Sequence, residues 1–442
     1  MTHTSIDRGS FVHWIRQAAP YIRAFRNKTF IISFGGEALL DGTLPHLIHD
    51  LGLLTSVGIK LVLVPGARPQ IEARLRARHL DLRYMQGLRV TDAASLECVK
   101  EAVAAVRLDL EAALSVAVSD SPMAGARVRV VSGNFIIARP IGVRDGVDFQ
   151  HTGEVRRIDS TALRRHLEEG TIVLIPPLGY SPTGETFNLA ASDVATAVAE
   201  TLDAEKLIFL IEDAGLRDRQ QQVVRQLSVE EAETILNKRQ TLSRETVYHL
   251  QKAVAACRLG VKRVHIIDRR MDGSLLLELF TRDGVGTMIA AENYEQTVPA
   301  TVDDIGGILA LIQPLEERGI LVRRPRELLE LEIHHFIVMK RDNQVIGCAA
   351  LYPFTDDQVA ELACLAIHPE YQKSGRGDAL LTYIENKAKT LGMKRLLVLT
   401  THAIQWFQER GFQAVNVDDL PGQRRVYYND QRNSRTLMKT LV

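Results

Sequence analysis

Six residues in the second half of the chain, Gln372-Lys373-Ser374-Gly375-Arg376-Gly377, have the composition of an anion-binding loop. Their two glycines allow positive φ angles and a close approach of the backbone to a ligand. A helix is expected to begin near Arg376, and successive N–H groups at a helix N-terminus suit a diphosphate. Lys373 and Arg376 would add positive charge. A glycine pair before a helix is also an ordinary tight connection, so the loop alone does not decide between the two interpretations.

The elements around this loop favour the binding interpretation. The apolar run 361–369 predicts a strand before it, and the run 395–400 predicts a strand after the helix. Within the helix, one apolar face and a terminating Gly392 fit a regular amphipathic pattern; the face consists of Leu380, Ile384, Ala388 and Leu391.

In this setting the Q-x-x-G-x-G loop resembles the acetyl-CoA motif of the GCN5-related N-acetyltransferases, and WFQERGF (406–412) resembles that family's closing element. The resemblance implies acetyl-CoA as cosubstrate, with no metal. The pantetheine arm would lie like an extra strand against the backbone of Cys364, Leu365, Ala366 and Ile367. A backbone N–H there would polarise the thioester carbonyl.

The attacking amine must be neutral, which requires a base. Resemblance to bacterial N-acetylglutamate synthases implies Glu361 as that base, whereas a carboxylate on a strand surface is the competing interpretation. Many family members protonate the departing thiolate with a tyrosine, but Phe407 stands at that place. The resemblance implies Thr400 for this role instead.

An acceptor such as L-glutamate brings two carboxylates, and arginine forks bind carboxylates through paired hydrogen bonds. Two arginine clusters offer this chemistry, in 321–330 and in 432–437. Arginine clusters are also ordinary solvated surface. The resemblance to the synthases implies that the acceptor is bound by Val322, Arg324, Cys364, Arg432 and Ser434.

The first half of the chain resembles the amino acid kinase fold, and 265–289 is the part most similar to N-acetylglutamate kinases. Phosphoryl transfer needs cations and glycine loops around the phosphates. Here Ser33-Phe34-Gly35-Gly36 lacks the expected lysine, and Arg68 follows a single glycine in the second loop. His249 stands in place of a lysine, although Asp193 is retained. An active kinase is therefore disfavoured.

A retained fold without kinase chemistry suits a sensor. In arginine-sensitive relatives L-arginine binds in this region, so the resemblance implies an allosteric inhibitor site at Tyr21, His265, Asp283 and Gly286. Each of these residues also has a structural interpretation. The apolar positions of 11–25 recur at helical spacing and need a partner surface. We therefore expect this helix to link subunits into a homo-oligomer, a hexamer by resemblance.

Bulk composition excludes several classes of protein. The 442 residues carry equal numbers of basic and acidic side chains, so no global charge favours nucleic acid or an anionic membrane. The four cysteines are far apart, which argues against a zinc site or a disulfide scaffold. No segment is long enough to span a bilayer, and we expect a cytoplasmic protein.

Coarse patterning divides the chain into four parts. The nearly continuous apolar runs 29–34, 60–66, 171–179, 206–213 and 263–268 alternate with helical stretches, which predicts a parallel sheet in a three-layer α/β/α sandwich. Hairpin-like strands after 300 predict a mixed α+β domain. The expected parts are 1–27 (oligomerisation helix), 28–290 (kinase-like regulatory domain), 291–298 (linker) and 299–442 (acetyltransferase domain).

The sequence therefore predicts an amino-acid N-acetyltransferase that makes N-acetyl-L-glutamate, the first step of arginine biosynthesis, with feedback inhibition by L-arginine. Three alternatives remain open: an acylamino-acid kinase with an accessory domain, a non-catalytic arginine-binding regulator, and an acetyltransferase with another acceptor amine.

Overall fold

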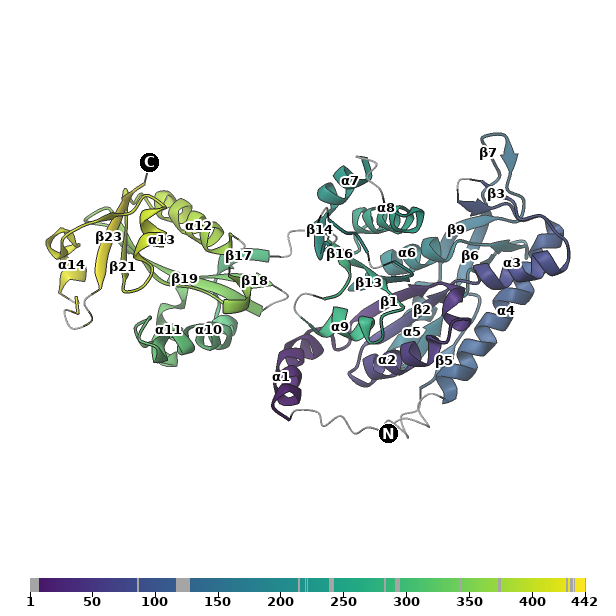
Figure 1. Ribbon diagram of the computed structural model, residues 1–442, viewed down its shortest axis with the longest axis horizontal. Helices are drawn as coiled ribbons and strands as arrows, with labels where there is room; N and C mark the ends of the chain where they lie inside the picture. Colours follow the sequence, from purple (N-terminus) through teal and green to yellow (C-terminus); the bar gives the residue numbers. More distant parts are fainter. Residues whose placement is uncertain are drawn as a thin grey trace. The chain divides into compact units, whose positions relative to one another are not determined.

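The computed structural model describes residues 8–441 except 86, 117–127, 214, 219, 221, 238–241, 282–283, 291–294, 342–343, 373–374, 427, 430–431 and 433. The chain forms two compact units, Met1–Asn293 and Tyr294–Val442. Each unit has its own sheet and its own hydrophobic core (Figure 1). No helix among the described residues has both the length and the apolar character needed to cross a bilayer.

The first unit is built on a sheet with the order β14-β16-β15-β13-β1-β2-β10-β5. Its central strands are parallel and almost completely buried, as their unbroken apolar sequences require. The strands are β1 (Thr29–Phe34), β2 (Lys60–Pro65), β5 (Val130–Val131), β10 (Ile172–Leu174), β13 (Lys206–Ile211), β14 (Gln226–Ser228), β15 (Arg263–Asp268) and β16 (Thr287–Ala290).

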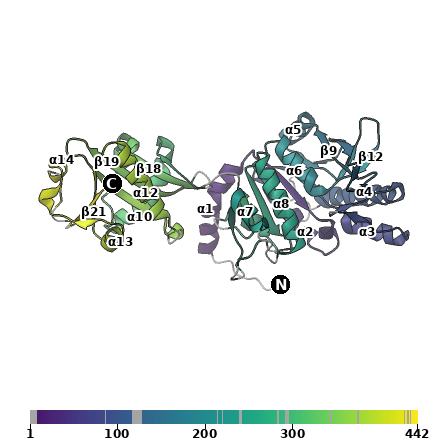
Figure 2. The ribbon, with the colours of Figure 1, turned by 90° about the horizontal axis from the view of Figure 1, so that it is seen from above.

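Helices cover both faces of this sheet, which confirms the predicted three-layer sandwich. Alternate residues of β1 show the arrangement: Ile31 belongs to the core under α5, α6 and α8, and Ile32 to the core under α2 and α9. Figure 2 shows α5 beside α6. The helices are α1 (Arg8–Phe25), α2 (Leu44–Ser56), α3 (Arg68–Ala77), α4 (Ala93–Val116), α5 (Ser160–Glu168), α6 (Ala191–Thr201), α7 (Val229–Asn237), α8 (Arg244–Arg258) and α9 (Ser274–Phe280), with the 3₁₀ turn η1 (Gly36–Leu39).

Two details of the first sheet differ from the prediction. The run 171–179 forms two strands in different sheets, because Pro176 and Pro177 lack the N–H groups that a continuous ladder needs. Strand β16, next to the edge strand β14, is antiparallel to β15, so the sheet is not wholly parallel. A separate sheet in the order β12-β11-β6-β9 was not predicted; its strands are β6 (Ile136–Pro140), β9 (Gly153–Ile158), β11 (Leu178–Tyr180) and β12 (Thr186–Asn188).

Helix α1 places part of its apolar face within its own unit. Ala18, Tyr21 and Phe25 are buried in the core that also contains residues of α9. Nearer the N-terminus of the helix, Trp14 and Ile15 remain 40% and 43% exposed. The C-terminal half of the helix therefore buries its apolar side chains within its own unit, whereas apolar side chains of the N-terminal half are exposed.

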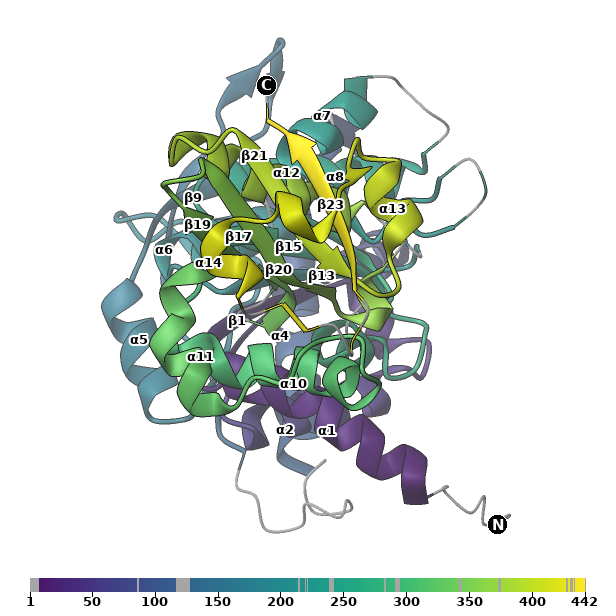
Figure 3. The ribbon, with the colours of Figure 1, turned by 90° about the vertical axis from the view of Figure 1, so that its left-hand side faces the viewer.

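The second unit has one mixed sheet in the order β17-β18-β19-β20-β21-β23-β22. Helix α12 packs on one face of it, and α10 and α11 pack on the other (Figures 1 and 3). The strands are β17 (Glu295–Pro299), β18 (Phe336–Arg341), β19 (Gln344–Phe354), β20 (Val359–Ile367), β21 (Arg395–Thr400), β22 (Gln413–Ala414) and β23 (Arg435–Thr440). The helices are α10 (Ile305–Glu317), α11 (Arg326–Glu332), α12 (Arg376–Thr390), α13 (Ile404–Gln408) and α14 (Gly422–Arg425).

The expected linker 291–298 needs correction at its C-terminal end. Residues 295–298 belong to β17, which pairs antiparallel with β18 from Glu295↔Arg341 to Pro299↔Ile337. The polar sequence of this segment hides the strand, because an edge strand contributes only one row of hydrogen bonds and little buried apolar surface.

Candidate active site and regulatory sites

The glycine loop of the second unit connects β20 to α12 as the sequence predicts. Gly375 is the N-cap of α12 with φ of +74°, a left-handed conformation that glycine adopts without strain. Gly377 lies against the Trp406 ring, which a Cβ at this position would approach to 3.2 Å. The first turn of α12, whose N–H groups cannot bond within the helix, therefore begins on a closely packed backbone.

Side chains of the loop act differently from the prediction. The guanidinium of Arg376 is bound to Glu295 of β17, with Nε 2.8 and 2.9 Å from the two carboxylate oxygens. The charge of Arg376 is thus largely neutralised by Glu295. Gln372 donates its side-chain amide to the carbonyl of Ile367 at 3.1 Å and so ties the loop to the end of β20. Lys373 and Ser374 lie outside the described residues.

Strand β20 separates from β21 where the resemblance places the cosubstrate arm. The two strands pair in parallel only as far as Leu362↔Val398. Cys364 has φ of +54°, and the register with β19 shifts at the same point, which is a β-bulge. The stretch Cys364–Ile367 therefore lies beyond the ladder with β21, which is where an inserted extended ligand would add its own backbone.

Glu361 is buried on β20, and its carboxylate is bound by Arg424 of α14. Arg424 Nε lies 2.5 Å from Oε2, and Nη2 lies 3.3 Å from Oε1. The competing interpretation, an exposed carboxylate on a strand surface, is wrong because the Glu361 side chain is only 9% exposed. The sequence analysis missed Arg424, whose only signal was a place in a polar stretch near the C-terminus.

Thr400 ends β21, next to the turn that leads into α13. Its hydroxyl oxygen accepts hydrogen bonds from the backbone N–H groups of His402 and Ala403, at 3.4 and 3.1 Å. Both bonds use the oxygen as acceptor, so neither of them involves the hydroxyl hydrogen. This geometry suits a proton donor at the end of the strand.

The structure brings Arg324 and Arg432 together although 108 positions separate them in the sequence. Burial and the positive charge of Arg324 lower the pKa of Arg432. Both guanidinium groups also act on the Cys364 thiol, whose pKa burial raises and the two arginines lower. Two like charges beside the bulge of β20 form a site with high affinity for an anion.

Backbone carbonyls and carboxylates hold these arginines in place. Arg432 Nη2 donates to the carbonyl of Ile320 at 2.6 Å, and Arg324 Nη1 donates to the carbonyl of Val322 at 3.2 Å. The Arg324 backbone N–H donates to Glu316 at 2.9 Å. Ser434 is buried nearby, and its carbonyl accepts from Tyr428. Of the predicted acceptor residues, Arg324, Arg432 and Cys364 thus lie near enough to act on one another electrostatically.

The kinase-like cleft of the first unit is a pocket of about 890 Å³ along the carboxyl ends of β1, β2 and β13. Its lining contains Glu37, Glu212 and Glu245, and burial followed by the charges of Glu212 and Glu37 raises the pKa of Glu245. The lining also contains Arg68, Arg89 and Arg244, so cationic and anionic side chains share the cleft.

Substitutions noted in the sequence fit this description. Arg68 turns to Glu72 at 3.1 Å and stacks over the ring of Tyr84. Asp193 is bound by Lys252, and burial lowers the pKa of His249. Arg68 and Asp193 thus already have charged partners within the protein, and His249 is partly buried.

Two of the predicted arginine-site residues lie in one buried cluster. His265 Nδ1 donates to Glu278 of α9 at 2.6 Å, while its Nε2 faces Lys206 Nζ of β13 at 3.0 Å. The Gly286 N–H donates to the other Glu278 oxygen at 2.8 Å. Tyr21 lies in the same core region on α1. Asp283 lies outside the described residues.

Burial lowers the pKa of His265 to about 4, so this imidazole is neutral at physiological pH. Burial raises the pKa of Glu278, but hydrogen bonds from His265, Gly286 and Val285 outweigh it and bring the value to about 2. The cluster therefore holds one fixed carboxylate. Sequence reasoning missed Glu278 and Lys206; their signal was a charge inside an otherwise apolar helix and strand.

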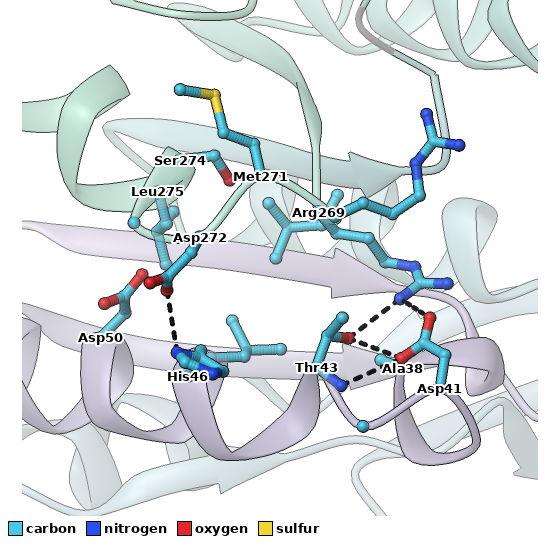
Figure 4. A pocket seen from close by; sticks show the side chains of 15 residues that line it. Ala38, Asp41, Thr43, His46, Asp50, Arg269, Met271, Asp272, Ser274 and Leu275 are labelled. Atoms are coloured by element: carbon cyan, nitrogen blue, oxygen red, sulfur yellow. Dashed lines mark hydrogen bonds and ion pairs between the residues drawn. The ribbon is translucent and has the colours of Figure 1, made fainter.

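A smaller pocket of about 200 Å³ lies at the opposite end of α9 (Figure 4). Arg269 binds Asp41 at 2.5 Å and Thr43 at 3.1 Å there, and His46 binds Asp272 at 3.0 Å. Burial and the charge of Asp272 raise the pKa of Asp50 to about 6. These contacts join α2 and the residues just before it to the loop before α9.

The fold and site geometry define an acetyltransferase unit joined to an amino-acid-kinase-like unit. Family models agree: the amino acid kinase family matches residues 28–268, and the acetyltransferase (GNAT) family matches 308–412. The chain is 50% identical to an amino-acid acetyltransferase of Ralstonia nicotianae, over 98% of this chain and 96% of that protein. It is 52% identical to that of Azotobacter vinelandii, over 98% and 99%.

Among solved structures, an N-acetylglutamate synthase from Neisseria gonorrhoeae complexed with coenzyme A and L-arginine matches with a TM-score of 0.89 at 42% identity, covering 98% of this chain and 99% of that chain. The same enzyme complexed with coenzyme A and N-acetyl-glutamate matches with a TM-score of 0.62 at 43% identity and the same coverage. The chain belongs to the amino-acid acetyltransferase family. It is an enzyme with acetyl-CoA as cosubstrate, as predicted.

Proposed function

We propose that this enzyme transfers the acetyl group of acetyl-CoA to the α-amino group of L-glutamate, giving N-acetyl-L-glutamate and CoA as the first step of arginine biosynthesis. The observation that carries the proposal is the pair Arg324 and Arg432, two mutually repelling guanidinium groups beside the bulge of β20. A dicarboxylic amino acid relieves this repulsion, whereas a neutral or basic acceptor does not.

In this proposal the loop at Gly375–Gly377 binds the diphosphate of CoA, and the arm lies along Cys364–Ile367. Glu361 takes a proton from the glutamate ammonium, and the resulting amine attacks the thioester carbonyl. The C–N bond forms and the C–S bond breaks. A backbone N–H of the bulge stabilises the developing oxyanion. Thr400 delivers its proton to the departing thiolate, and the second proton released by the amide nitrogen restores the Thr400 hydroxyl.

The proposal is tested by a thiol-release assay with acetyl-CoA against each of the amino acids. We expect strong preference for L-glutamate. Arg324→Ala and Arg432→Ala should each raise the KM for glutamate at least roughly tenfold, because each removes a charged hydrogen bond worth about 1.5–3 kcal/mol. Arg326→Ala is the control, since its exposed side chain pairs with Glu330 along the same helix. Equal activity toward unrelated amines would contradict the proposal.

We further propose that L-arginine inhibits the enzyme by binding in the first unit beside Glu278, His265, Gly286 and Tyr21. Glu278 supports this, because a buried carboxylate held by backbone N–H groups matches a guanidinium or an ammonium. The gonococcal relative complexed with L-arginine also supports it. Isothermal titration with L-arginine, and the acetyl-transfer rate in its presence, test the site. An unchanged rate at saturating arginine would contradict inhibition.

The proposed assembly is a cytoplasmic homo-hexamer joined through α1. The exposed apolar side chains of Val12, Trp14 and Ile15 support a subunit contact at this end of the helix. Sedimentation equilibrium tests the subunit number, and a monomer at micromolar concentration would contradict it.

A further inference from the structure

The ion pair between Arg424 and Glu361 has a function that the proposed acetyl transfer alone does not explain. Glu361 is buried, and two nitrogen atoms of one guanidinium contact its carboxylate. Both oxygens of the Glu361 carboxylate are thus in contact with one guanidinium. A base has to reach the acceptor ammonium directly or through one water. The contact with Arg424 therefore has to open when the acceptor arrives.

Arg424 belongs to a short segment that is held at both ends. Helix α14 has four residues. Leu420 before it is buried against Val359 and Leu397, and Tyr428 after it packs on the same cluster and donates its hydroxyl to the carbonyl of Ser434. The next residue, Arg425, has a 53% exposed side chain and only a distant partner, Asp418 at 3.9 Å. Arg424 thus reaches inward from a segment whose neighbour points to solvent. An arginine side chain on such a segment can change partner without breaking regular structure.

The site for the acceptor carboxylates lies next to this ion pair. Tyr352 of β19 is the direct cross-strand neighbour of Glu361, and directly opposed side chains lie about 5 Å apart. The Tyr352 hydroxyl donates to Glu332 at 2.6 Å. Burial lowers the pKa of Arg324, whereas Cys364 and then Tyr352 raise it. An anion at Arg324 therefore arrives one side chain away from Arg424.

We propose that Arg424 is an exchangeable counter-ion, which holds Glu361 in the free enzyme and passes to a carboxylate of the incoming amino acid when that substrate binds. This inference rests on the proposed function of the same site. The exchange removes the positive charge from Glu361 at the moment when the substrate ammonium reaches it. The proton then passes from the ammonium nitrogen to Glu361, and the amine is left with the lone pair that attacks the thioester. Without a carboxylate on the acceptor, Arg424 stays on Glu361 and the base remains blocked.

The exchange makes Arg424 a determinant of acceptor binding and of access to the base. The groups that face Glu361 are Arg424 from α14 and Tyr352 from β19, and its neighbour on β21 is the apolar Leu397. Removing Arg424 should therefore leave no other cation in contact with Glu361 among the described residues. Both consequences can be measured separately.

The experiment compares Arg424→Gln, Arg424→Lys and Arg425→Gln in the full chain, with kcat and KM for L-glutamate from pH 5 to 9 at saturating acetyl-CoA. For Arg424→Gln we expect a rise in KM of about tenfold, the effect of one lost charged contact. Arg424→Lys should recover part of this affinity, and Arg425→Gln should behave as wild type.

Binding of N-acetyl-L-glutamate to the CoA-loaded protein, by calorimetry, gives a readout independent of turnover. It should weaken about tenfold in Arg424→Gln while CoA binding stays unchanged, which also reports that the site is folded. Unchanged KM and unchanged product affinity in Arg424→Gln would overturn the exchange and leave Arg424 as a fixed partner of Glu361. If wild-type protein acetylates no amino acid, the proposed function fails first, independently of Arg424.

Discussion

At the scale of single residues, Glu278 gives the sharpest test of the buried cluster in the first unit. Replacing it with glutamine removes the charge that accepts from His265, Val285 and Gly286. We expect the free energy of unfolding of this unit to fall by about 2 kcal/mol at pH 7, since hydrogen bonds to charged groups contribute about 1.5–3 kcal/mol. Urea unfolding measures the change. The control is Glu169→Gln, because Glu169 at the C-terminal end of α5 is exposed and pairs with Arg165. This substitution should change stability little.

The same residues determine how stability depends on pH. The pKa of Glu278 in the folded protein, about 2, is below its ordinary 4.5, so its stabilisation is present above pH 4.5 and is lost as pH falls toward 2. The lowered pKa of His265, about 4, adds a loss as pH falls from 6.5 to 4, because only the unfolded state takes up the proton there. The difference between wild type and Glu278→Gln should therefore shrink on acidification to pH 3. A constant difference would contradict the assigned charge.

Sequence reasoning located residues whose types stand out locally and missed those defined by tertiary contact. Gly375 belongs to a sequence motif, and Arg324 and Arg432 belong to arginine clusters. The structure places the two arginines near each other. Arg376 looked equivalent, yet Glu295, 81 positions away, neutralises it. Arg424 and Glu278 act through partners on other elements, and no single-sequence pattern encodes such pairs.

At the scale of elements, the start of α12 predicts a specific effect on CoA binding. Gly375 and Gly392 stand near opposite ends of this helix with φ of +74° and +77°, and a Cβ at either would meet open space. Replacing either by alanine should cost about 1 kcal/mol of stability from the left-handed backbone. Only Gly375→Ala should also weaken CoA binding, several-fold by calorimetry, because only that turn presents N–H groups to the diphosphate. Equal CoA affinity in both variants would contradict the loop assignment.

Elements with unbroken apolar patterning were predictable, and those that depend on pairing were not. The predicted strand at 29–34 has the bounds of β1, and the predicted helix from Arg376 begins where α12 begins. Strand β17 was not predicted because it is a polar edge strand. The sheet β12-β11-β6-β9 was not predicted because its short strands are stabilised by their neighbours rather than by their own composition. The bulge at Cys364 likewise depends on its partner strand β19.

At the scale of the whole molecule, α1 tests the proposed assembly. Ile15→Glu places a charge on the exposed apolar half of the helix, where it would be buried in a subunit contact. We expect sedimentation velocity to show smaller species and arginine inhibition to weaken. Gln17→Glu adds the same charge at an exposed polar position two residues along and should leave the assembly intact. Unchanged sedimentation of Ile15→Glu would place the contact elsewhere.

The division into two compact units predicts that catalysis and regulation can be separated. Every residue proposed for acetyl transfer, from Val322 to Ser434, belongs to Tyr294–Val442, while the Glu278 cluster belongs to Met1–Asn293. A protein containing only the second unit, beginning before β17 so that Glu295 still binds Arg376, should therefore acetylate L-glutamate with a KM within a few-fold of the full chain and show no response to arginine. Its circular dichroism and CoA affinity control for folding. A folded second unit that binds CoA but lacks turnover would show instead that the first unit contributes to the active site, and a unit still inhibited by arginine would place the effector site outside the kinase-like fold.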